Sequence, residues 1–241
     1  MKLIVFDIGG VCAHFRKFYT NSSSLSYSIP SRTTVAGIIA AILGYERDSY
    51  YEIFSCSNLN IAIRKMSKTR KIMQSLNYMK ATTTTELVCP KEHTQIPFEL
   101  VVGDNGVKYR IYVSHKDDEI MRRLYESLKN KSSIYPPYLG AAPFCASFEL
   151  IGTYEAEERI GDNNFVEIST VISQNNIADK GLKLVPGVSI FKDRMPREFG
   201  HGREIRETAS YIYDENLNPL LVKVKYSYYV IKETGENILF M

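Results

Sequence analysis

An amphipathic helix between residues 31 and 44 constrains the fold of this chain more than any other sequence feature. Ser31, which follows Pro30, has the side-chain oxygen of a good helix N-cap. Apolar residues then recur at i, i+3, i+4, i+7 and i+8, at Val35, Ile38, Ile39, Ile42 and Leu43. Gly44 is a typical C-terminal stop. The pattern predicts a helix with one buried face.

Strand patterns and a second helix surround this first one. Residues 2–8 are apolar and end at Gly9-Gly10, which predicts a buried strand followed by a turn or a close backbone approach. Alternating apolar residues predict strands at 59–64, 107–113 and 144–150, the second of them preceded by the turn signal Asp104-Asn105-Gly106. Acidic residues followed by an apolar face predict a helix over 117–128.

The predicted order is strand, helix, strand, strand, helix, strand, which is typical of a ferredoxin-like α+β domain. We therefore expect a ferredoxin-like βαββαβ domain at residues 1–154. The roughly forty residues between the second and third strands are too many for a hairpin loop, so a β-rich insertion is expected at about 66–105. Residues 155–241 contain only strand signals and predict a small β-rich C-terminal subdomain.

Positive charge is concentrated in the first third of the chain, although the net charge is only +3. Residues 1–85 hold eleven Lys and Arg against four acids, and residues 55–85 hold six basic residues and no acid. Interleaved with Tyr78, Met73 and Met79, this strip suits a nucleic acid, whose phosphates bind cations and whose bases stack on aromatic rings. The alternative is a solvated basic hairpin without a ligand.

The composition of the chain and the absence of several sequence motifs exclude most other classes of protein. No run of about 18 apolar residues is present, and the N-terminus lacks a signal-peptide pattern, so we expect a cytoplasmic protein without a membrane partner. The four cysteines are far apart, which argues against disulfides and zinc knuckles. A P-loop, a dinucleotide fingerprint and the HExxH and GxSxG motifs are all lacking. We therefore expect neither a cofactor nor a catalytic metal.

Three chemical alternatives remain open. Asp7 after the first strand resembles the nucleophile of haloacid-dehalogenase-type phosphatases, but Gly9 stands where that family needs a second acid. Metal-free RNA cleavage needs a base and a cation, which His115-Lys116 would supply, assisted by Tyr19, Tyr27 or His14. The simpler interpretation of 114–117 is a polar turn.

The basic stretch 194–206 either contacts phosphates or is a surface loop balanced by its own acids.

Several of these segments together resemble the CRISPR-associated (Cas) family five. The resemblance is carried by the first strand, by His14-Phe15-Arg16, and by the segment from Tyr27 through Pro30-Ser31-Arg32-Thr33-Thr34 to Leu43-Gly44. Tyr109-Arg110-Ile111-Tyr112-Val113 and Tyr138-Leu139-Gly140 add to it, and the likeness spans roughly residues 1–155. The family consists of RAMP-superfamily subunits of the type I Cascade surveillance complex, and the chain is most similar to type I-B members.

The resemblance implies a non-catalytic subunit for antiviral defence that binds and caps the 5′ handle of the crRNA. Its implied partners are the crRNA, the Cascade backbone and large subunits and, indirectly, target DNA. The insertion would be the family's thumb, and Tyr138-Leu139-Gly140 its glycine-rich loop, where backbone amides approach RNA. The implied RNA-binding residues are Arg16, Lys17 and Arg32 at the handle, Arg64, Lys65, Lys68, Arg70, Lys71 and Lys80 along the thumb, and Tyr138, Leu139 and Gly140.

One branch of the family, in type I-C systems, cuts precursor crRNA with Tyr, Lys and His. The alternative function is therefore a metal-independent endoribonuclease that uses His115, Lys116 and Tyr27.

Overall fold

The first helix begins and ends where the sequence predicts. In the computed structural model, which describes residues 1–241, α1 spans Arg32–Leu43. The Ser31 side chain accepts a hydrogen bond from the Thr34 N–H, and Gly44 adopts the left-handed conformation at φ +80°. The C-cap N–H of Gly44 returns to carbonyls of the last turn. Local capping signals thus set both ends of α1.

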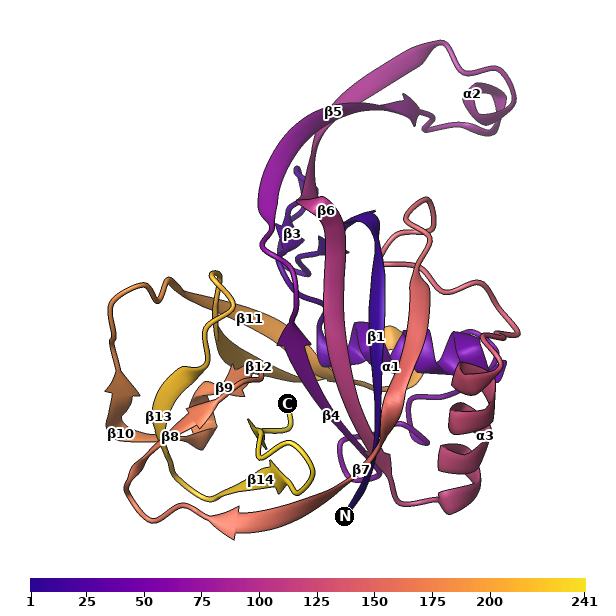
Figure 1. Cartoon of the computed structure of the whole chain (residues 1–241). Helices are drawn as coiled ribbons and strands as arrows, with labels where there is room; N and C mark the ends of the chain where they lie inside the picture. The colour runs from indigo at the N-terminus through magenta and orange to yellow at the C-terminus, as the bar shows by residue number, and fades with distance from the viewer.

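Four long antiparallel strands form the centre of the main sheet. They lie in the order β7 (Ser147–Ile160), β1 (Lys2–Ala13), β6 (Glu92–His115) and β4 (Leu59–Lys65). The helix α3 (Asp118–Lys129) connects β6 to β7, and α1 lies between β1 and β4 in the chain. Ile4, Phe6 and Ile8 of β1 pack in one core cluster with apolar side chains of α1 and α3, so both helices share one face of the sheet (Figure 1).

C-terminal strands extend and cover this sheet. β14 (Ser227–Ile231) pairs with β7, and β15 (Asn237–Ile238) pairs with β14. Leu3 and Val5, on the opposite face of β1, pack against residues of β14 and β15. β7 runs without a break past residue 154, where the sequence predicts a domain boundary.

Two three-stranded sheets and one short pair complete the fold. One sheet has the order β10 (Ile177–Lys183), β13 (Leu220–Val224), β8 (Phe165–Ile168). The other has the order β11 (Ile190–Phe199), β12 (Ile205–Asp214), β9 (Ile172–Ser173). The short strands β2 (Phe15–Arg16) and β3 (Ser26–Tyr27) pair with each other, and single 3₁₀ turns lie at Gln174–Asn176 and His201–Arg203.

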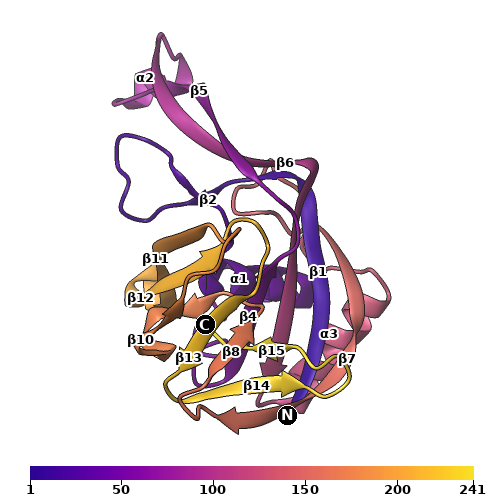
Figure 2. The ribbon, with the colours of Figure 1, turned by 60° about the vertical axis from the view of Figure 1, so that its left-hand side comes forward.

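A long hairpin projects from the main sheet (Figures 1 and 2). β5 (Arg70–Lys80) pairs with the first half of β6 from Arg70 opposite Val102 to Lys80 opposite Glu92, and α2 (Thr84–Val88) lies at its tip. The hairpin lies within the insertion expected at 66–105. The predicted turn at 104–106 is wrong as a chain reversal, because β6 is one 24-residue strand. Gly106, at φ +80°, instead belongs to a bulge where β6 has extra residues opposite Gly10 and Cys12.

The helices of the structure are short. α1 and α3 have 12 residues each, and no helix is both long and apolar enough to span a bilayer.

Candidate nucleic-acid interface

A groove of about 790 Å³ lies along α1. Its walls come from five segments: the chain after β1, one side of α1 over most of its length, the loop after α1, the loop after α3, and the end of β11 with the 3₁₀ turn that follows. The residues that carry its aromatic and cationic character are Phe15, Arg16, Phe18, Tyr27, Tyr45, Arg47, Tyr50, Tyr51, Tyr135, Tyr138, Phe199 and Arg203.

Small residues and backbone hydrogen bonds fix the groove walls. A Cβ on Gly37 of α1 would lie 3.1 Å from the Tyr50 hydroxyl, so the glycine lets the loop after α1 pack closely. The Tyr135 N–H donates to the Ala41 carbonyl oxygen at 3.0 Å, which ties the loop after α3 to the end of α1. Gly140, at φ +88°, lies so close to His14 that a Cβ would be 2.0 Å from the His14 carbonyl oxygen. Backbone contacts thus shape the walls.

Three guanidinium groups line the groove. Arg203 Nε donates to Asp48 Oδ1 at 2.9 Å and to the Tyr51 hydroxyl oxygen at 3.1 Å. Arg47 lies 3.3 Å from Asp48, with 77% of its side chain exposed. Arg16 donates to the Thr20 carbonyl oxygen at 3.3 Å and has no ion pair. Two of the three cations share one carboxylate, and Glu46 also lines the groove, so these three cations and two acids leave a small positive excess.

Aromatic rings supply the second component of the groove. Phe18, Tyr135 and Tyr138 are 39%, 45% and 44% exposed, so each presents part of a ring to solvent. Burial, and then the hydrogen bond to Asp48, raise the pKa of Tyr51 to about 12, so its hydroxyl stays protonated at neutral pH. Exposed rings beside guanidinium groups can stack on unpaired bases while the cations contact phosphates.

The structure brings only part of the sequence-predicted handle site into this groove. Arg16, Tyr138 and Gly140 line it. Lys17 is held by Asp193 at 2.7 Å, and Leu139 is fully buried.

Arg32 cannot reach a ligand in this conformation, and we correct its assignment. It is 2% exposed, and its Nη2 donates to the carbonyl oxygens of Phe54, Ser55 and Leu59 at 3.0, 3.0 and 2.6 Å. The guanidinium therefore ties the start of α1 to the chain before β4.

The predicted thumb cations are matched by acids that are distant in sequence. Arg64 pairs with Glu236 at 2.7 Å and buried Lys65 pairs with Glu215, so these two residues of β4 join the C-terminal strands. On the hairpin, β6 supplies the partners: Asp104 for Arg70, Glu99 for Lys71 and Glu92 for Lys80. Lys68 is exposed and has no ion pair. The strip without acids is thus balanced in space, and residues 66–105 carry five Lys and Arg against four acids.

The predicted nuclease residues do not come together. Tyr27 is 1% exposed and donates its hydroxyl to the Arg194 carbonyl oxygen. Tyr27 is adjacent in the chain to Ser28, whose carbonyl oxygen accepts a hydrogen bond from the Tyr109 hydroxyl. His115 lies at the end of β6, six residues and about 20 Å along the strand from Tyr109. His115 Nδ1 accepts from the Asp117 N–H at 2.9 Å, and Nε2 donates to the Ile53 carbonyl oxygen at 3.0 Å. Both ring nitrogens are engaged by backbone groups, as in a polar turn.

Asp7, the phosphatase-like residue, is also engaged. It is 2% exposed and accepts two hydrogen bonds from Arg110 and an ion pair from Lys108. These cations lower the pKa of its carboxyl group despite the opposing effect of burial.

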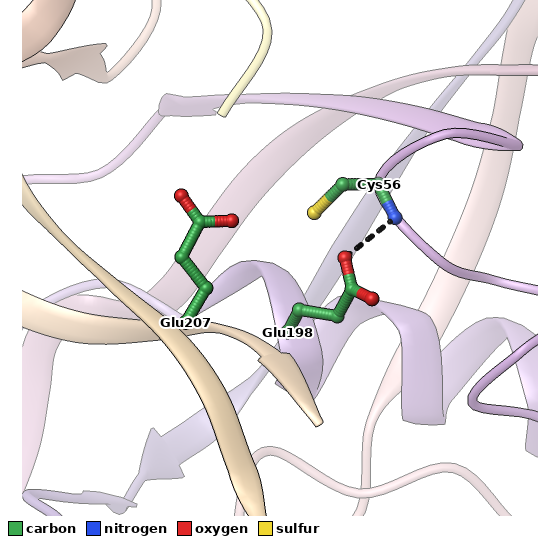
Figure 3. Close-up of side chains that lie close together, drawn as sticks. All are labelled: Cys56, Glu198 and Glu207. Atoms are coloured by element: carbon green, nitrogen blue, oxygen red, sulfur yellow. Dashed lines mark hydrogen bonds between the residues drawn. The ribbon is translucent and has the colours of Figure 1, made fainter. Parts of the chain in front are cut away.

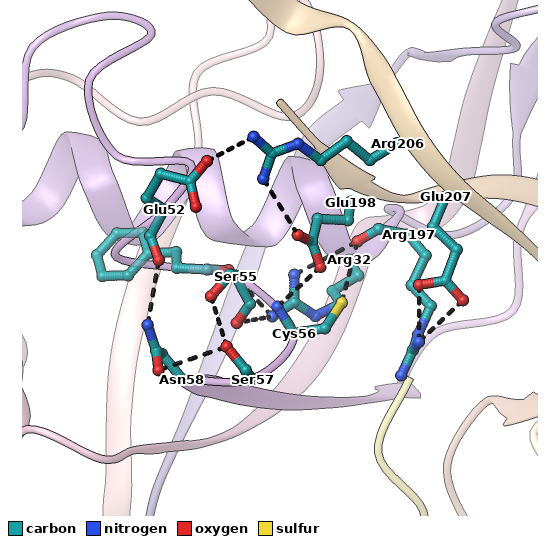
Figure 4. Close-up of polar contacts among 11 residues, drawn as sticks. Arg32, Glu52, Ser55, Cys56, Ser57, Asn58, Arg197, Glu198, Arg206 and Glu207 are labelled. Carbon is teal, nitrogen blue, oxygen red and sulfur yellow. Dashed lines mark hydrogen bonds and ion pairs between the residues drawn. The ribbon is translucent and has the colours of Figure 1, made fainter. Parts of the chain in front are cut away.

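Cys56, Glu198 and Glu207 form a compact cluster between the chain before β4 and the strands β11 and β12 (Figure 3). The ligand-type atoms lie within 4.8 Å of one another. Both carboxylates also pair with arginines, Glu207 with Arg197 at 2.9 Å and Glu198 with Arg206 at 3.8 Å (Figure 4). Burial raises the pKa of the Cys56 thiol to about 11, which disfavours the thiolate that binds metals. The contacts support a structural network that joins three segments.

Sequence reasoning missed Arg47 and most of the tyrosines in the groove. The tyrosine-rich stretch 45–51 and the rigid Tyr135-Pro136-Pro137-Tyr138 were available as signals. For the basic stretch 194–206 the sequence left phosphate contact and a surface loop open, and only the packing of the chain after β11 on α1 brings Arg203 to the groove.

The fold is that of a CRISPR protein. The structure is similar to the crystal structure of a CRISPR protein from Archaeoglobus fulgidus, with a TM-score of 0.61 and 12% sequence identity over 98% of both chains. A structure described as a CRISPR RNA-guided surveillance complex matches less closely, with a TM-score of 0.49 and 12% identity over 91% of this chain and 90% of that one.

The sequence itself identifies the family. The model of the family described as CRISPR-associated protein (Cas_Cas5) matches residues 3–172, which is more than half of the chain. The chain therefore belongs to the Cas5 family, as the motifs around α1 and residues 138–140 indicate. No curated protein matches the chain.

Proposed function

We propose that this protein is a non-catalytic subunit of a type I Cascade surveillance complex, of subtype I-B, that binds and caps the 5′ handle of the crRNA. The groove along α1 carries the proposal, because it combines exposed rings with Arg16, Arg47 and Arg203. Such a surface suits a single strand whose bases are unpaired. Membership of the Cas5 family supports a role in a CRISPR effector complex.

The arrangement of the main sheet supports the same assignment. The order β7-β1-β6-β4, with α1 and α3 as the connecting helices, is the order of a ferredoxin-like domain, and we infer that fold here. The projecting hairpin of β5 and β6 would contact the neighbouring backbone subunit, and the large subunit would bind nearby. Met73, Met79 and Leu87 are 55%, 47% and 61% exposed on this hairpin, which favours a protein partner there.

The backbone contacts of His115 favour binding without cleavage. With both ring nitrogens engaged, the ring has no free site from which to take a proton.

The test is RNA loading by the full chain with labelled repeat RNA in EDTA, read on native and denaturing gels. We expect a shift without cleavage, and we expect Tyr138→Ala to weaken it about tenfold, since one base stack contributes about 1–3 kcal/mol. Arg122→Ala, which changes an exposed arginine of α3 outside the groove, serves as the control. The same pair of variants should differ in crRNA content when copurified with partner subunits.

Two outcomes would overturn the proposal. Equal RNA loading by the Tyr138 and Arg122 variants, alone and in the complex, would remove the groove from the interface. Cleavage at one site that His115→Ala abolishes would establish the nuclease instead.

A further inference from the structure

The outer face of the sheet β10-β13-β8 has a composition unlike the rest of the C-terminal strands. Along β13, Leu220, Val222 and Val224 are buried in the second core cluster. Because side chains alternate across a strand, Leu221 and Lys223 point to the other face, and exposed Lys225 follows directly after the strand. Lys183 lies opposite Leu221, and Phe165 lies opposite Lys223. Two lysines and an aromatic ring therefore share one face, and a third lysine follows at its end.

The lysines gather around two partly exposed rings. The Nζ atoms of Lys183 and Lys223 lie 5.7 and 5.0 Å from the centroid of the Phe165 ring, although they come from different strands. Lys225 Nζ lies 5.0 Å from the centroid of the Tyr226 ring. Phe165 is 40% exposed and Tyr226 is 57% exposed.

Charge on this face is not neutralised within the molecule. None of the sixteen ion pairs of the structure includes Lys183, Lys223 or Lys225, whereas the cations of the hairpin each have an acidic partner except Lys68 and Lys91. The alternation of β8 places one acid, Glu167, on the same face. The ammonium groups are therefore free to meet an external anion.

We propose that this face binds single-stranded nucleic acid, with phosphates on Lys183, Lys223 and Lys225 and bases stacked on Phe165 and Tyr226. A polynucleotide uses both components, because it offers phosphates at a spacing that several lysines can reach and flat rings that stack on aromatic side chains. An acidic protein surface would engage the lysines but leave the rings without a matching group.

The face is separate from the groove along α1. No residue of β8, β10 or β13 lines that groove, and in both views these strands lie below the projecting hairpin (Figures 1 and 2). The proposal therefore adds a second contact and does not rest on the handle-binding role. RNA and DNA single strands share the required chemistry, and the experiment distinguishes them.

The experiment measures the affinity of the RNA-free full chain for labelled oligouridylate and oligodeoxythymidylate of about 12 nucleotides across a salt series. All proteins carry Tyr138→Ala, which weakens the groove equally in each of them, so that differences between the variants come from the C-terminal face. Lys183→Ala with Lys223→Ala should reduce the slope of log K against log salt by about 1.4, because each phosphate contact to a single strand contributes about 0.7. Phe165→Leu keeps the apolar packing but removes the ring, and should weaken binding about tenfold without changing the slope.

The matched control is Lys129→Ala, which removes a lysine 5.9 Å from the ring centroid of Tyr125 on α3. It should leave affinity and slope unchanged. A lower affinity of the variants for the RNA probe, the DNA probe or both would support the proposal and show which nucleic acid this face binds. Unchanged slope and affinity with both probes would overturn it and leave an acidic protein as the partner of the lysines. That result would not affect the groove, which the comparison of Tyr138→Ala with Arg122→Ala tests independently.

Discussion

His14 shows how a single polar side chain holds the base of the hairpin. Its ring is 3% exposed, stacks on Phe98 with ring centroids 3.9 Å apart, and bonds at both nitrogens. Nδ1 donates to the Glu99 carbonyl oxygen at 2.7 Å, so Nε2 must accept from the Ser24 hydroxyl at 2.9 Å. A second proton would break the bond to Ser24, and burial lowers the pKa of the imidazole.

We therefore expect His14 to make folding stability fall as the solution is acidified. Above about pH 6.5 the ring is neutral in both states; below it the unfolded chain takes up a proton that the folded ring resists. The contribution of His14 to the free energy of unfolding is thus complete at neutral pH and is lost by at most about 1.4 kcal/mol per pH unit on acidification. Urea unfolding of the protein and of His14→Gln at about pH 7.5 and about pH 5.5 measures it. An equal acid sensitivity of the two proteins would contradict the assignment.

Gly140 has a structural role that its place in a glycine-rich loop does not reveal. Gly140→Ala should lower the free energy of unfolding by more than about 2 kcal/mol, because it combines a positive φ with a clash against the His14 carbonyl oxygen. The control is Gly187→Ala, since Gly187 has φ +87° but no atom within 4 Å, and it should cost only about 1 kcal/mol. Equal midpoints in urea for the two variants would show that the loop yields freely, and Gly140 would then serve the approach of RNA.

At the scale of elements, local signals predicted α1 and α3 well, but they missed α2 and the full extent of β6. Ser31, Gly44 and the spacing of Val35 and Ile39 specify α1 within a few residues of chain. The length of β6 depends instead on β1, β4 and β5, which pair with different parts of it from far along the chain. For the same reason the acids opposite the basic strip were not foreseen. The burial of Arg32 was not foreseen either, because the carbonyl oxygens that bind its guanidinium belong to Phe54, Ser55 and Leu59.

The ion pairs of the hairpin change what its cations are expected to do with RNA. Arg70 pairs with Asp104 through side chains that are 66% and 88% exposed, so it can exchange that partner for a phosphate at little cost. Lys71 is 28% exposed and also donates to the Ser26 carbonyl oxygen at 2.6 Å. Arg70→Ala should reduce the salt slope of RNA binding by about 0.7, while Lys71→Ala should leave the slope unchanged. If the variant with both substitutions lowered the salt slope by about 1.4, both residues would contact RNA phosphates and the prediction for Lys71 would be wrong.

At the scale of the whole molecule, the C-terminal third completes the cores of the N-terminal part. Val171, Met195, Tyr211 and Met241 belong to the same cluster as Phe6 and Ile39. On the other face of the sheet, Ile231 and Ile238 cover Leu3 and Val5. β7 crosses residue 154 while it pairs with both β1 and β14. A cut at the predicted boundary would therefore open apolar surface on both faces of the main sheet.

We expect residues 1–154 alone to lack a cooperative unfolding transition, because the fragment exposes Leu3, Val5 and much of the main core and ends within β7. Expression together with residues 155–241 should restore the transition by supplying the missing side chains and β14 in trans. Circular dichroism during urea unfolding, with the intact chain as the reference, measures both. If residues 1–154 unfold cooperatively by themselves, the predicted boundary separates two independent domains. If only the paired fragments unfold cooperatively, the groove along α1 depends on the C-terminal part of the chain, which supplies Pro196, Phe199 and Arg203 to its wall.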